Sequence, residues 1–158
     1  MSDFAMANSV LRQAYRANDD DNLTPTRVQA MVYILHGWCL AIMDQNLLSE
    51  PFIAERYGPI LPRLKLDLLR YGNSPVDDYC LEYSRVSEDF VPFFINEASL
   101  PQFRGILDQV WKTYQPLTTV QLRTQALLPG SPWGATVQGQ PIDNRLIRED
   151  FIRRSRQA

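Results

Sequence analysis

The side chains best suited to chemistry in this 158-residue chain are a single histidine, two cysteines and a short acidic run. A catalytic or multi-histidine metal site built on His36 needs partner groups that this pattern does not supply. His36 directly precedes Gly37-Trp38 in a strongly apolar stretch. This position favours a buried histidine satisfied by a hydrogen bond to a neighbouring helix, and the alternative is a catalytic role.

The remaining reactive residue types do not form a recognisable catalytic motif either. Cys39 and Cys80 are far apart and match neither a CxxC site nor a disulfide framework. Asp19 to Asp21 lack the spacing of a calcium loop, and no Walker loop or GxGxxG is present. Ser131 is followed by Pro132, which does not fit a nucleophile elbow. The sequence therefore predicts a protein that is not an enzyme and that holds no cofactor or metal.

Composition predicts one soluble domain spanning residues 1–158. Hydrophobic residues make up 45% of the chain and charged residues 22%, with a net charge of −2. This balance gives no general attraction to nucleic acid or to an anionic membrane. The exception is a cluster of arginines near the C-terminus, which can also be explained by the helix dipole. The arginines of this cluster are Arg145, Arg148, Arg153, Arg154 and Arg156.

The N-terminus MSDFAMANSV has no basic region and no long apolar region, so we expect no signal peptide. We also expect no DNA-binding module ahead of the predicted first helix. No apolar run reaches the ~18 residues that a membrane span needs. We therefore expect a cytoplasmic protein without membrane contact.

The positioning elements are predicted from periodicity and capping signals. A first helix is expected over about 4–18, and Thr24-Pro25 starts a second that ends near Met43. Because its apolar residues cover more than one face, this helix belongs at the centre of the fold. A short extended piece follows at Phe52–Ala54. Gly58-Pro59 then lead into a helix over 60–71 that ends at Gly72.

The second half of the chain predicts a hairpin and three further helices. Alternation around Tyr79–Tyr83 suits a strand, and 90–95 suits its antiparallel partner. Ser99 is expected to cap a helix that ends near Tyr114, and Thr118 or Thr119 a short helix to Ala126. A loop covers 128–141. Asp143 caps a last helix of about 143–154, with Arg153–Arg156 frayed. The fold class is mainly α: a single compact helical domain of about six helices, with a small β-hairpin or short extended pieces.

The tryptophans indicate where the core lies. Trp38 and Trp111 fall on the apolar faces of predicted helices. Trp133 lies in the loop between two helices, where it can plug the core or stand exposed as a binding anchor. We favour the plug.

Several motifs, in their order along the chain, resemble the Panacea domain, also described as the GepA-like or SocA-like phage-associated family. The family's first motif resembles residues 28–33 with Gly37-Trp38, and its second resembles residues 47–64. Arg70-Tyr71-Gly72 resembles the short motif that follows the second one in the family. Further matches lie at 122–125, at Pro132-Trp133, and at Ile142, Ile147 and Phe151.

The chain departs from the family pattern at three positions. His36 stands where the family has Gln, Gln125 stands where it has His, and Ala30 replaces a Lys. If the family's Gln and His contact each other, this chain has exchanged the pair. This hypothesis predicts that His36 meets Gln125.

The resemblance implies a mainly α-helical antitoxin that neutralises a toxin, encoded nearby, by direct binding. Some family members instead act as proteolytic adaptors, so a protease or secretion component is an alternative partner, and an uncharacterised enzyme is a third interpretation. Nucleic acid is not the expected partner. We expect partner contacts at Arg56, Tyr57, Arg63 and Arg70. The structural motif comprises Tyr33, His36, Gly37, Trp38, Gly58, Pro59, Gly72, Thr124, Gln125, Pro132 and Trp133.

Overall fold

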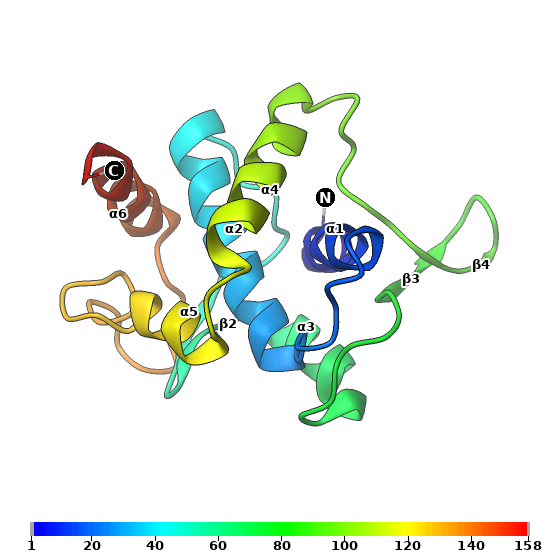
Figure 1. Cartoon of the computed structure of the whole chain (residues 1–158), viewed down its shortest axis with the longest axis horizontal. Helices are drawn as coiled ribbons and strands as arrows, with labels where there is room; N and C mark the ends of the chain where they lie inside the picture. The colour runs from blue at the N-terminus through cyan, green and yellow to red at the C-terminus, as the bar shows by residue number, and fades with distance from the viewer. Residues whose placement is uncertain (1, 158) are drawn as a thin grey trace.

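Helix α2 (Pro25–Met43) runs through the middle of the molecule in the computed structural model, which describes residues 2–157 (Figure 1). The Thr24 hydroxyl accepts a hydrogen bond from the Arg27 backbone N–H, and Pro25 occupies the first turn. As predicted, α2 is buried on nearly all sides. Because every neighbouring helix packs on it, α2 sets the positions of the others. Those in contact with it are α1, α3, α4, α5 and α6.

Residues 2–157 form six α-helices, one 3₁₀ turn and two small antiparallel sheets of two strands each. The mainly α fold with short hairpins is therefore confirmed. The helices besides α2 are α1 (Asp3–Arg16), α3 (Pro62–Leu68), α4 (Pro101–Tyr114), α5 (Thr119–Ala126) and α6 (Asn144–Gln157), with the 3₁₀ turn at Leu69–Tyr71.

The first sheet is a hairpin of strands β1 (Ile53–Glu55) and β2 (Gly58–Ile60). The prediction that a helix starts at Ile60 is wrong, because Ile60 pairs with Ile53 and α3 begins only at Pro62. Gly58-Pro59 likewise belong to a strand rather than to a turn before the helix. Gly58 has a φ of 135°, a conformation that side chains resist, so this position favours glycine.

A buried amide fixes the point at which α3 starts. The side chain of Gln29, on α2, donates from Nε2 to the Leu61 carbonyl at 3.0 Å and accepts the Leu61 N–H at 3.1 Å. Leu61 caps α3 and contributes no side-chain hydrogen bond of its own. Gln29 therefore joins β2 and α3 to the central helix.

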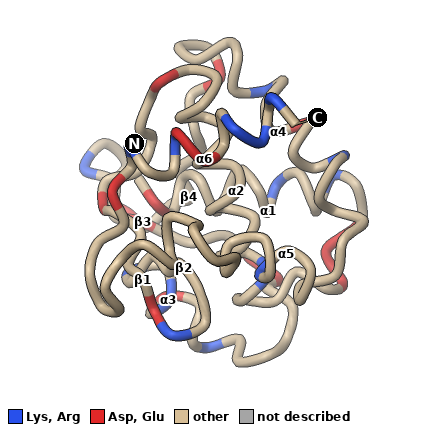
Figure 2. Tube along the Cα trace, turned by 90° about the vertical axis from the view of Figure 1, so that its left-hand side faces the viewer, with Lys and Arg blue, Asp and Glu red and all other residues tan. Residues whose placement is uncertain are grey.

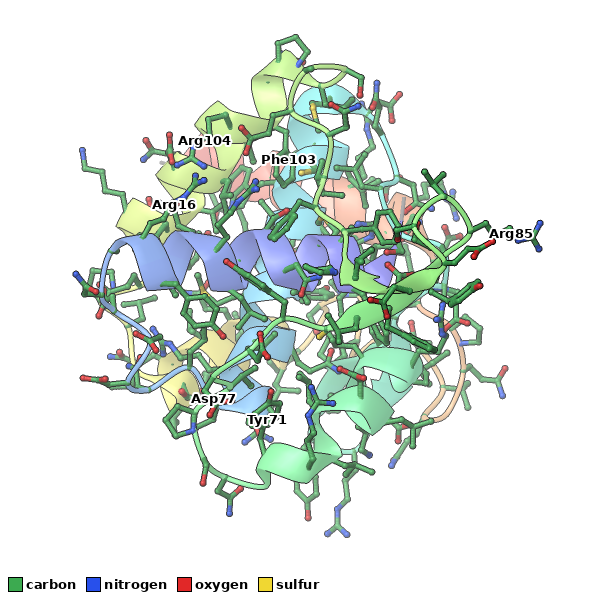
Figure 3. The ribbon with its side chains drawn as sticks, turned by 90° about the vertical axis from the view of Figure 1, so that its right-hand side faces the viewer. Arg16, Tyr71, Asp77, Arg85, Phe103 and Arg104 are labelled. Atoms are coloured by element: carbon green, nitrogen blue, oxygen red, sulfur yellow. The ribbon has the colours of Figure 1, made fainter. Side chains whose placement is uncertain are left out.

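The second sheet is a hairpin of strands β3 (Leu81–Ser84) and β4 (Asp89–Pro92), which extends away from the helices (Figure 1). Figure 3 shows Arg85 at its outer end and Phe103 in the body of the molecule. At the base of the hairpin, the Asn8 amide binds both the N–H and the carbonyl of Cys80, each at 2.8 Å. The predicted hairpin is present, with shorter strands than expected.

Two predictions about helix ends are wrong, and one is confirmed. Leu100, not Ser99, precedes α4, because the Ser99 hydroxyl is engaged with the Asn96 carbonyl at 3.1 Å. Helix α6 continues to Gln157 instead of fraying, since Arg154 pairs with Asp150 one turn earlier at 3.1 Å. Thr118 caps α5 as expected, through a capping box with Gln121.

Candidate functional site

A groove of about 640 Å³ opens between α2, the β1–β2 hairpin, α3 with its 3₁₀ extension, and α5. Its lining combines buried apolar side chains with exposed charged ones. Leu68, Leu122 and Ala126 are almost fully buried and form an apolar floor. This hollow brings together segments from the first half of the chain and from α5.

The groove carries an excess of positive charge. Three cationic side chains, Arg56, Lys65 and Arg123, line it against one carboxylate, Glu55. None of the three cations forms a salt bridge with any residue in 2–157. In Figure 2 basic positions lie close to the β1–β2 hairpin and to α5. The groove is thus locally cationic in a chain whose net charge is −2.

Tyr57 lies at the turn of the β1–β2 hairpin, between two arginines. Its side chain is 65% exposed. The guanidinium carbon of Arg56 lies 5.3 Å from the ring centroid, and that of Arg123 lies 5.8 Å from it. Arg123 also donates from Nη2 to the Tyr57 carbonyl at 2.9 Å. Because cations over an aromatic face are attracted to it, the three side chains support one another.

The loop that follows α5 holds the hairpin in place. Trp133 donates from Nε1 to the Glu55 carbonyl at 2.6 Å. Ala54 exchanges backbone hydrogen bonds with this loop, donating to the Gln140 carbonyl at 2.9 Å and accepting from the Gly139 N–H at 2.7 Å. Trp133 is half-buried against the core. This agrees with its interpretation as a core plug.

The four predicted contact residues separate into two pairs. Arg56 and Tyr57 line the groove, whereas Arg63 and Arg70 do not. The Arg63 guanidinium lies 5.2 Å from the centroid of the Phe4 ring. Arg70 is exposed and pairs with Asp67 at 3.4 Å on its own helical segment. The structure therefore brings only the first pair together at one site.

Sequence reasoning missed Lys65, Leu69 and Arg123 in the groove. Lys65 and Leu69 stand one helical turn apart, so their shared face was readable from spacing. Arg123 stands 66 positions from Tyr57, and no local pattern joins them. Only the packing of α5 beside β2 brings Arg123 to the groove.

His36 is buried and lies outside the groove lining. Its Nε2 lies 2.9 Å from the Asn144 side-chain oxygen, so it makes the expected contact with another helix. Burial lowers the pKa of His36 from 6.5 to about 4, which leaves the ring neutral at pH 7. The hypothesis that it contacts Gln125 is wrong, because the Gln125 side chain accepts from Arg154 at 3.4 Å.

The other residues of the motif around α2 pack in the core. A Cβ at Gly37 would overlap the Phe151 ring, so the close approach of α6 requires glycine here. Trp38 donates from Nε1 to the Tyr114 hydroxyl at 3.0 Å. The buried Tyr33 ring packs edge-on against Phe52, with centroids 5.1 Å apart, and Tyr33 also contributes to the groove.

The remaining motif residues terminate or stabilise turns. Gly72 caps the 3₁₀ turn with a φ of 58°, and it and the buried Pro59 line the groove. Thr124 is exposed and donates from its hydroxyl to the Val120 carbonyl at 2.7 Å. Pro132 is buried, and its carbonyl accepts from the Thr136 hydroxyl at 2.7 Å.

The arginines of the C-terminal helix are largely paired with acids. Arg148 lies 3.0 Å from Asp44, and both Arg153 and Arg154 contact Asp150. Figure 2 shows basic and acidic positions interspersed along α6. This helix therefore presents a mixed surface rather than a continuous basic one.

Within residues 2–157, no three His, Cys, Asp or Glu side chains are grouped so that they could hold a metal ion. No helix in the same range combines the length and apolarity required to cross a bilayer.

Comparison with known proteins adds no relative. No family model, no curated protein and no solved structure matches this chain.

Proposed function

We propose that this protein is a cytoplasmic binding module that neutralises a partner toxin by direct contact, as an antitoxin or immunity protein does. The observation that carries the proposal is Tyr57, exposed between Arg56 and Arg123 beside an apolar floor. Tyrosine and arginine are the residue types most enriched among the few that dominate protein–protein binding energy. A desolvated pocket beside them is the usual setting of such residues.

The bracing of the hairpin also favours a binding role. Backbone bonds to the loop after α5 and the Trp133 indole attach β1 to the body of the protein. A surface that is already ordered loses less conformational entropy when a partner docks. The order of motifs along the chain that resembles the Panacea domain is the reason for proposing a toxin, encoded nearby, as that partner.

The test is co-expression with the neighbouring small open reading frames. Wild-type protein should restore growth of cells that express the toxic neighbour and should co-purify with its product. Tyr57→Ala should weaken the complex about 30-fold, the effect of losing a dominant contact of ~2 kcal/mol.

Tyr83→Ala is the matched control, because Tyr83 is similarly exposed on the other hairpin, at 56% against 65% for Tyr57. This variant should neutralise the toxin as wild type does. Neighbours that remain lethal in the presence of the wild-type protein would count against neutralisation.

A second candidate function is an adaptor that delivers the bound toxin to a protease. The observation that favours it is a separate apolar surface on the β3–β4 hairpin, across the molecule from the β1–β2 hairpin (Figure 1). An adaptor needs two such surfaces, one for each partner. Phe90→Ala would then lengthen the half-life of the toxin in cells without weakening its binding, and an unchanged half-life argues against delivery.

A further inference from the structure

We propose that the groove binds an acidic segment of the partner, one that carries a large apolar side chain among aspartates or glutamates. This inference rests on the proposed function and names the chemistry of the segment that the groove recognises. It follows from three properties of the groove: its excess positive charge, its apolar floor and the small extent of its cationic region.

The charge of the groove is not neutralised within the molecule. Arg56 and Lys65 are exposed and have no acidic partner in residues 2–157. Arg123 uses one Nη to bind the Tyr57 carbonyl, an uncharged acceptor. Three cations facing a single carboxylate, Glu55, leave an excess of two positive charges. Carboxylates of a docked segment would complement that excess.

The first turn of α2 adds to the same field. Pro25 and Thr26, in the first turn of this 19-residue helix, line the groove, and Gln29, Ala30 and Tyr33 continue the lining along the side of the helix. The helix dipole places partial positive charge at the N-terminal end, which favours anionic groups nearby. This contribution is secondary to that of the three side chains.

The floor requires an apolar group as well as charge. Leu68, Leu122 and Ala126 are almost fully buried beneath the groove, and Leu69 is 62% exposed at its edge. Together with Tyr57, these side chains form a surface that a leucine or an aromatic residue would cover. The groove therefore favours a mixed acidic and apolar segment over a uniformly charged one.

A peptide segment fits these features better than a nucleic acid. Nucleic acid binding relies on a tract of cations that follows many phosphates. Outside the groove, Arg148, Arg153 and Arg154 of α6 are paired with acids, and Arg63 lies against the Phe4 ring. The cationic region is thus short and is confined to one hollow.

The experiment selects ligands without assuming the partner. A phage library of random dodecapeptides is panned on the intact protein, and the selected peptides are measured by fluorescence polarisation. We expect sequences of net negative charge with at least one large apolar residue. Binding should fall about tenfold in each charge-reversal variant, Lys65→Glu and Arg56→Glu. It should also weaken as salt concentration rises.

The control is Lys112→Glu. The chain has only two lysines, and Lys112 is exposed on α4 outside the groove. This variant makes the same change in net charge and should bind the selected peptides as wild type does. Equal loss in Lys112→Glu and Lys65→Glu would show that net charge, not the groove, sets affinity.

In the binding assays, three further results would overturn the inference. The first is selection of basic or neutral peptides, and the second is unchanged peptide binding in Lys65→Glu. The third is tighter binding of a labelled 20-nucleotide RNA probe that Lys65→Glu abolishes. If the Lys65→Glu/Arg56→Glu double variant still neutralises the toxin, the groove is not the site that binds the partner, although the proposed function is unaffected. If acidic peptides bind as expected but no neighbouring toxin is neutralised, the groove is supported as a binding site and the proposed function is rejected.

Discussion

The two hairpins of this protein have the same local structure but differ in how far the rest of the protein covers them. Each is a short antiparallel pair of strands. In β1–β2, Ala54 and Pro59 face each other and are buried, and the loop after α5 binds the backbone of β1. In β3–β4, Tyr83 and Phe90 face each other and are 56% and 63% exposed.

A pair of strands does not by itself decide whether a hairpin is anchored or exposed. An isolated two-stranded hairpin is marginally stable, so each one depends on what holds it. The β1–β2 hairpin is hydrogen-bonded to the loop after α5 and presents Tyr57 at its turn, where Arg123 binds the Tyr57 carbonyl. The β3–β4 hairpin is held at its base by Asn8, which also donates to the Phe93 carbonyl at 2.9 Å. Its outer face is left free to contact another molecule.

The largest effect that separates the hairpins is expected from Trp133→Ala. Loss of the half-buried ring and of its hydrogen bond to Glu55 should lower the free energy of unfolding by about 3 kcal/mol. Hydrogen exchange should quicken at Ala54 and Glu55 and stay unchanged in β3–β4. Trp133→Phe is the control: it keeps most of the ring and should cost about 1 kcal/mol. Unchanged protection of β1 in the alanine variant would contradict the bracing role.

Asn8→Ala should act on the other hairpin. It removes three hydrogen bonds, two to Cys80 and one to Phe93, and leaves buried backbone groups without partners. We expect a loss of 2 to 3 kcal/mol in the free energy of unfolding, at ~1 kcal/mol per bond. Exchange should quicken near Cys80 and stay slow at Ala54. Faster exchange in both hairpins would mean that they are coupled through α1.

Acidification should loosen the region around β1 through His36. The His36 ring packs 5.6 Å from that of Phe52, which directly precedes β1. Its pKa is about 4 when folded, below the ordinary value of 6.5, so the unfolded chain binds the proton more tightly. Stability from this group is complete above about pH 6.5 and is lost as pH falls towards 4.

Between pH 7 and pH 5 this linkage amounts to about 2 kcal/mol, at ~1.4 kcal/mol per pH unit below the unfolded pKa. Urea titrations of wild type and His36→Gln at both pH values isolate it, since other groups titrate alike in the two proteins. The variant should lose about 2 kcal/mol less than wild type on acidification. Parallel losses in the two proteins would show that His36 titrates normally.

The smallest effect is expected from the exposed face of β3–β4. Phe90→Thr keeps a residue suited to strands and removes only one side of the contact with Tyr83, whose ring centroid lies 5.6 Å away. The free energy of unfolding should change by about 0.5 kcal/mol or less, as for most surface substitutions. Thermal unfolding measures it. A loss as large as that of Asn8→Ala would show that the exposed face supports the fold.

Local signals in the sequence predicted much of the fold. Thr24-Pro25 starts α2 and Thr118 caps α5, because a cap needs only groups within one helical turn. The apolar residues on more than one face of α2 likewise predicted that this helix lies at the centre of the fold. Local reasoning failed where a distant partner intervened: the pairing of Ile60 with Ile53, together with the binding of Gln29 to Leu61, delays the start of α3.

The candidate site shows the same division. Local signals identify Arg56 and Tyr57 as a polar and an aromatic residue directly ahead of Gly58-Pro59, upstream of a helix, but they do not reveal the hairpin in which these residues lie. Long-range packing brings Arg123, 66 positions from Tyr57, to the Tyr57 carbonyl, and it places His36 against Asn144, 108 positions away. Caps and periodicity depend on neighbours within a turn of the chain. A groove depends on which helices share a core, and that is settled when the buried faces pack together.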